Sequence, residues 1–150
     1  MKHKISEAER QRRQRKYTNM LIILAIMIAV SVISFMQGEN AVRFDWTETQ
    51  VTVTDPAENT FTVVYADLTS VTLEAVSGYG TCLDGGKAEG FYYGQWENPQ
   101  WGRYTLCAST APKLCIVMRT GETTYVLSYE SDKITSALYE SICTLLENTH

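Results

Sequence analysis

Residues 104–130 read YTLCASTAPKLCIVMRTGETTYVLSYE, and apolar residues alternate with polar ones along most of this stretch. A period of two predicts β-strands with one buried face. A first turn at Thr110-Ala111-Pro112 folds the second strand back on the first, and a second turn at Gly121-Glu122 folds the third strand back on the second. The stretch therefore predicts two consecutive antiparallel hairpins.

The two hairpins can be tested against each other, because they share their middle strand. The first hairpin places Leu106 opposite Ile116, Ala108 opposite Leu114 and Tyr104 opposite Met118. The second hairpin places Met118 opposite Tyr125, Ile116 opposite Leu127 and Leu114 opposite Tyr129. Both hairpins therefore place the same apolar residues of the middle strand, Leu114, Ile116 and Met118, on the buried face. A slip of one residue would turn each set to the other face, so the agreement supports both registers.

Earlier segments follow the same period. Strand candidates are residues 42–46, 49–55, 60–66 and 70–76, with a turn at 55–59 between the second and the third. Residues 77–90 contain five glycines and are expected to form a loop. We expect about seven strands in all.

The period changes to that of a helix after Ser131, which is expected to cap it. The apolar stripe of this helix consists of Ile134, Leu138, Ile142 and Leu145. The fold class is therefore mostly β (α+β): a bent antiparallel sheet or small barrel, capped by a C-terminal amphipathic helix.

The uncharged run MLIILAIMIAVSVISFM, residues 20–36, precedes the strands. With residues 17–19 it reaches the roughly 20 residues that span a bilayer. We predict a transmembrane helix at 17–36 and a linker at 37–41. A cleaved signal peptide has the same order of basic and apolar residues, but no small-x-small site follows the run. A buried soluble helix fits less well, because the run is apolar on every side.

Charge is divided unevenly between the two ends. Residues 1–16 carry seven Lys and Arg against two Glu, whereas residues 37–150 carry six basic and fifteen acidic residues. Because Lys and Arg resist translocation, we expect a cytoplasmic tail at 1–16 and a single-pass chain whose C-terminal domain lies outside. The tail either touches anionic lipid or serves only as a topology signal. It is too short, and too poor in aromatics, to predict nucleic-acid binding.

Three segments and the closing helix carry a family resemblance. YADLTSV (65–71), GFYYGQWENPQWGRYTLCAS (90–109) and KLCIVMRTGETTYVLS (113–128) resemble the bacterial pleckstrin homology family of small membrane proteins, in which a Gly-x-aromatic-x-Gly hairpin precedes the last strands. The resemblance implies a pleckstrin-homology-like (PH-like) domain at 42–148, in a bacterial cell membrane. It also implies a module for binding or assembly rather than catalysis.

Aromatic residues crowd the segment 90–104, where they either pack the core or form a contact patch. If a partner site exists there, Tyr93, Trp96 and Trp101 are the candidates. An alternative is a small-ligand or lipid-sensing cavity lined by Tyr92, Trp96 and Tyr125. An anionic headgroup near the first hairpin is disfavoured by the many acidic residues there.

Groups that could support catalysis or hold a cofactor are scarce. The only histidines are His3 and His150, and no phosphate-binding loop is present, so we expect no enzyme, no metal and no cofactor. The predicted register sets Cys107 opposite Cys115, which allows a disulfide if the compartment is oxidising. The partner is expected to be an unknown protein or a second copy.

Overall fold

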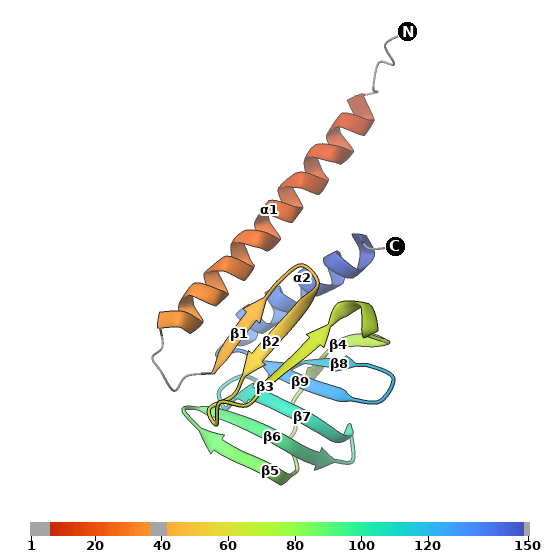
Figure 1. Ribbon diagram of the computed structural model, residues 1–150. Coiled ribbons are helices and arrows are strands. Elements are labelled where there is room, and N and C mark those ends of the chain that lie inside the picture. The colour runs from red at the N-terminus through yellow and green to blue at the C-terminus, as the bar shows by residue number, and fades with distance from the viewer. Residues whose placement is uncertain (1–6, 37–41, 149–150) are drawn as a thin grey trace.

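The structure is a computed structural model that describes residues 7–36 and 42–148, with the backbone alone at 33–36. Helix α1 (Glu7–Met36) is followed by nine strands and helix α2 (Asp132–Asn148) (Figure 1). The strands are β1 (Arg43–Trp46), β2 (Gln50–Thr54), β3 (Thr60–Val64), β4 (Ser70–Ala75), β5 (Thr81–Ala88), β6 (Phe91–Asn98), β7 (Gly102–Ser109), β8 (Leu114–Arg119) and β9 (Thr124–Ser128), and a short 3-10 helix η1 (Tyr65–Asp67) joins β3 to β4. The mostly β class with a terminal helix is confirmed. The predicted linker at 37–41 and the start of the tail lie outside the described residues.

The nine strands form two sheets. The smaller has the order β1-β2-β3 and the larger β4-β8-β9-β7-β6-β5. The first four predicted strands and the turn at Asp55 agree with β1 to β4. The main core lies between the two sheets and α2, where the Phe44 ring meets those of Phe91 and Tyr129 with centroids 6.2 and 5.6 Å apart. A second cluster, around Trp96 and Trp101, fills the other face of the larger sheet.

One of the two predicted hairpins is confirmed and the other is wrong. β8 and β9 pair antiparallel with Ile116 opposite Leu127 and Met118 opposite Tyr125, as expected. β7 does not pair with β8. Instead β9 lies between them and runs parallel to β7, with Leu106 opposite Val126.

The connection from β7 to β8 explains this difference, because other segments hold it. The Thr110 N–H donates to the Gly90 carbonyl at 2.9 Å, and the N–H groups of Lys113 and Leu114 donate to Asp132 Oδ1 at 2.8 and 2.9 Å. In a tight hairpin turn these N–H groups would instead donate to carbonyls of the neighbouring strand in the same hairpin. The connection instead delivers β8 to the far side of β9, where it also pairs with β4.

The glycine-rich segment expected to be a loop contains strand β5, so that prediction is wrong. β5 pairs with β6 along its whole length, and the register shifts between Cys82 and Asp84. It is an edge strand with mostly exposed residues, so it carries no alternation of buried and polar side chains. Its Gly85 faces Gly94 of β6, and both have positive φ (+116° and +100°). The pair of glycines therefore bends the β5–β6 ribbon.

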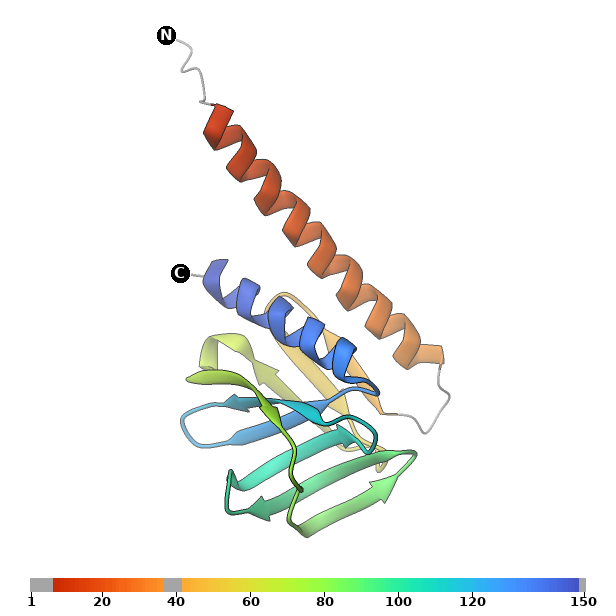
Figure 2. The same cartoon turned by 180° about the vertical axis from the view of Figure 1, so that it is seen from behind.

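Helix α2 begins as predicted. Ser131 Oγ accepts from the Ile134 N–H at 3.2 Å, and Asp132 ties the first turn to β8. Leu138 and Ile142 are fully buried, and Ile134 and Leu145 pack beside them. α2 packs on β8 and β4 of the larger sheet, and α1 runs past both β1 and α2 (Figures 1 and 2).

Helix α1 is continuous and includes the described part of the basic tail. It is long and apolar enough to cross a membrane. Ile23, Met27 and Val30 are buried against the rest of the chain, where α1 contacts β1 and α2. The N-terminal part projects away from the strands in both views (Figures 1 and 2). Large apolar side chains elsewhere on α1 are exposed, by 42–66%: Tyr17, Met20, Leu21, Ile22, Leu24, Ile28 and Val32.

Candidate functional site

The structure separates the three aromatic residues that the sequence singles out. Trp96 and Trp101 are buried in the second cluster, whereas Tyr93 is half-buried and lines a groove on the other face of the sheet. Trp96 Nε1 donates to the Tyr93 carbonyl at 2.9 Å, and the Trp101 ring meets Tyr104 edge-on at 5.2 Å. The two tryptophans pack the core, so Tyr93 is the candidate that faces an open surface.

Glu74 on β4 holds the turn between β6 and β7. Its carboxylate accepts from Trp101 Nε1 at 2.8 Å, Gln100 Nε2 at 2.9 Å and Thr72 Oγ1 at 2.7 Å, and Arg119 lies 3.5 Å away. Burial alone would raise the pKa of Glu74, but these hydrogen bonds and the Arg119 charge together lower it below its usual 4.5. The ionised carboxylate thus joins the edge strand β4 to the distant turn between β6 and β7.

We predict that Glu74→Gln destabilises the protein in a pH-dependent way. A pKa lowered by folding gives stability that is present above pH 4.5 and is lost as pH falls through the folded-state pKa. At pH 7 the variant should lose about 1–2 kcal/mol of unfolding free energy. Denaturant titrations at pH 7 and pH 3 measure this, and the difference between the two proteins should shrink at pH 3. An equal difference at both pH values contradicts this role for the charge.

The four cysteines are free, and the predicted disulfide loses its structural basis. Because β9 separates β7 from β8, Cys107 pairs with Leu127 and Cys115 with Glu74. The two thiols belong to different core clusters. Burial raises the pKa of Cys115 to about 12, helped by the nearby Glu74 charge, and burial also raises that of Cys107. Cys82 on β5 is the exposed thiol.

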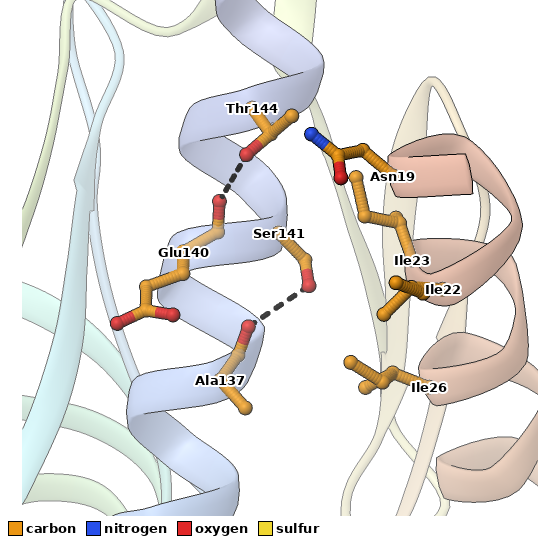
Figure 3. Close-up of a pocket in the computed structure, with 8 residues that line it drawn as sticks. All are labelled: Asn19, Ile22, Ile23, Ile26, Ala137, Glu140, Ser141 and Thr144. Atoms are coloured by element: carbon orange, nitrogen blue, oxygen red, sulfur yellow. Dashed lines mark hydrogen bonds between the residues drawn. The ribbon is translucent and has the colours of Figure 1, made fainter. Parts of the chain in front are cut away.

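A shallow cleft of about 250 Å³ separates α1 from α2 (Figure 3). The side chains of Ile22, Ile23 and Ile26 point from α1 toward α2, where Ala137 and Ser141 face them. The Ser141 hydroxyl donates to the carbonyl of Ala137 at 2.9 Å, so it is satisfied within its own helix. The apolar and small groups line one part of the cleft, and the polar side chains of Asn19, Glu140 and Thr144 line the rest.

Another groove lies beside Tyr93 and has a volume of about 350 Å³. It lies between the β2–β3 hairpin and the bent β5–β6 ribbon, with Phe61 and Tyr125 stacked at 5.5 Å on its wall. The alternative cavity expected from Tyr92, Trp96 and Tyr125 does not form. Tyr92 and Trp96 meet in the second cluster, whereas Tyr125 packs against the main core.

Phe61 and Asp84, which also line this groove, were not predicted as site residues. They come from β3 and β5, and no local motif links them. Among the residues that the structure describes, no group of three or more His, Cys, Asp or Glu side chains could hold a metal ion.

No protein-family model, curated protein or solved structure matches this chain. The resemblance to the bacterial pleckstrin homology family therefore rests on the sequence pattern.

Proposed function

We propose that this chain is a single-pass membrane protein of a bacterial cell. Residues 17–36 anchor it, the tail at 1–16 is cytoplasmic, and the domain at 42–148 lies outside. The domain is PH-like and serves as a non-enzymatic module for protein interaction or self-association. The observation that carries the anchor is the exposed apolar surface of α1, seven large side chains on one helix.

A bilayer would cover this surface more completely than the domain does. Full burial of one large apolar side chain contributes about 1.5–3 kcal/mol. Seven side chains are about half exposed, so burying the exposed parts would contribute roughly 5–10 kcal/mol more of hydrophobic free energy. Insertion would gain this free energy and would also keep Ile23, Met27 and Val30 in an apolar medium.

Insertion would also hold the domain at the membrane. The five residues between Met36 and Val42 can reach at most about 20 Å. The surface of β1 and α2 that α1 covers, which includes Trp46, Ala137 and Ser141, would then become free next to the bilayer. A free surface of this kind supports a role in contacts with a partner at the membrane.

The recognition role is tested by crosslinking the full-length protein in its membrane and identifying what is attached. A specific partner or a dimer is expected. A protein that stays monomeric at every concentration and captures nothing specific contradicts the role. A small-ligand role is the alternative, and the groove beside Tyr93 is the observation that favours it.

We predict that a maleimide that cannot cross membranes labels Cys82 in intact cells. Cys82 is exposed, whereas Cys107 and Cys115 are buried with raised pKa values and should react only after denaturation. Mass spectrometry gives the labelling of each cysteine-containing peptide separately, and Cys82→Ser is the control that removes the label from the peptide around residue 82. Labelling of Cys82 only after the cells are permeabilised would place the domain inside and overturn the orientation.

A further inference from the structure

The groove beside Tyr93 has an unusual combination of aromatic rings and negative charge. Three half-buried rings line it: Phe61 from β3, Tyr93 from β6 and Tyr125 from β9. The face of an aromatic ring carries partial negative charge and attracts cations. The rings come from both sheets, so the groove exists only in the folded domain.

The ionisable side chains in the lining, apart from the tyrosines, are two carboxylates. Asp55 is occupied: its Oδ1 accepts from the N–H groups of Ala57 and Asn59 at 2.9 Å each, and its Oδ2 accepts from the Asn59 side chain. Asp84 is exposed, and no described residue forms a hydrogen bond or an ion pair with its side chain. The lining contains no Lys, Arg or His. Asp84 is therefore a carboxylate available to a ligand, at the edge of an aromatic groove.

Two of the polar side chains on the floor, Gln95 and Thr105, bond to each other. Gln95 Nε2 donates to Thr105 Oγ1 at 2.8 Å, which leaves the Gln95 carbonyl oxygen as an acceptor. Gly85 and Gly94 line the bend with backbone, at a point where the two strands approach too closely for a side chain. The two carboxylates repel an anionic ligand, whereas a cation finds carboxylate and carbonyl acceptors and ring faces.

We propose that this groove binds an organic cation, a guanidinium or ammonium group carried by a small molecule or by a peptide side chain. The cation lies between the rings of Tyr93 and Phe61–Tyr125 and pairs with Asp84. The volume of about 350 Å³ is at the lower end of the range for small-ligand pockets, so it has room for the cationic group and for part of the molecule that carries it. This inference gives a ligand chemistry to the proposed recognition module, and it does not rest on the membrane anchor.

The test is a titration of the full-length protein in dodecyl maltoside micelles with N-acetyl-arginine methylamide, followed by isothermal calorimetry or by NMR. The neutral analogue N-acetyl-citrulline methylamide has nearly the same shape and is the matched control ligand. We expect saturable binding of the arginine compound and at least tenfold weaker binding of the citrulline compound. Equal binding of the two compounds, or no binding of either, overturns the proposal.

Two variants locate the binding. Asp84→Asn should weaken arginine binding about tenfold, because a charge-assisted hydrogen bond is lost. Glu97→Gln removes an exposed charge on β6 outside the groove and should leave binding unchanged. Equal weakening by both variants would show nonspecific attraction to an acidic domain and would refute the site. Tyr93→Leu keeps apolar bulk but removes the ring, and it should weaken binding about threefold or more.

A dipeptide series separates the two sources of the cation. Acetyl-Gly-Arg-amide binding more tightly than the blocked arginine assigns the groove to a peptide side chain, and equal or weaker binding assigns it to a small molecule. Either result supports the proposed cation chemistry. If none of these compounds binds and the protein is membrane-bound, the proposed cation site is refuted and the membrane anchor is not. If the compounds bind and the protein is not membrane-bound, the anchor is refuted and the cation site is not.

Discussion

Gly94→Ala should cost about 3–5 kcal/mol of unfolding free energy, which is among the largest losses of stability expected from a single methyl group in this domain. A Cβ at Gly94 would lie 2.1 Å from the Asp84 carbonyl oxygen and 2.8 Å from the Gly85 Cα. Both are backbone atoms, so β5 would have to move away. The φ of +100° adds strain, since L side chains rarely adopt it.

Two other glycines provide graded controls for this measurement. Gly90 has a φ of +77° but nothing within 4 Å of an added Cβ, so Gly90→Ala should cost about 1–2 kcal/mol from backbone strain alone. Gly121 has open space around it and no positive φ, so Gly121→Ala should change stability by less than about 0.5 kcal/mol. Urea unfolding followed by tryptophan fluorescence gives all three values. A Gly94→Ala loss no larger than that of Gly90→Ala would mean that β5 does not approach β6 in this way.

Paired lysines on α1 should release the protein from membranes. Leu24 and Ile28 are 42% and 55% exposed and lie near the middle of the predicted span. A lysine near the middle of a spanning helix costs about 2.5–3.5 kcal/mol, so Leu24→Lys with Ile28→Lys should cost roughly 5–7 kcal/mol of insertion free energy. Flotation of cell membranes on a sucrose gradient measures the bound fraction, which should fall from nearly all to a minority.

A matched pair of substitutions separates charge from packing. Leu24→Ala with Ile28→Ala removes the same side chains without adding charge, and this variant should still float with the membranes. If α1 were only a helix docked in water, both pairs would replace exposed apolar groups and neither would change the fractionation. Identical flotation of the lysine variant and the parent protein contradicts a spanning α1.

The sequence predicts the β8–β9 hairpin because the pairs Ile116–Leu127 and Met118–Tyr125 are apolar on a single face and the turn between them is short. The same period-two pattern could not identify the neighbour of β7. Leu106 needs an apolar neighbour on the adjacent strand, and Ile116 and Val126 both provide one. Hydrogen bonds from the β7–β8 connection to distant segments favour the pairing with Val126. Alternation specifies which face is buried, and it does not specify the order of strands in a sheet.

The candidate site was predictable only in part. Tyr93 and Trp96 are three positions apart on β6, so a period of two already places them on opposite faces, and this signal separates the groove residue from the core residue. Phe61, Asp84 and Tyr125 lie on three other strands. Their meeting depends on how the smaller sheet packs on the larger one and on the bend at Gly85 and Gly94. The packing of the sheets leaves no local pattern in the sequence, and the glycines indicate only that a bend is allowed, not which strand lies opposite it.

The spanning helix is the central claim, and alkaline carbonate extraction tests it most directly. Membranes from cells that make the unmodified chain are washed at high pH, which strips peripheral proteins, and are then sedimented. If α1 spans the bilayer, the full-length protein stays in the pellet and enters solution only with detergent. Recovery of the intact chain in the carbonate supernatant, with residues 1–36 still attached, would contradict it.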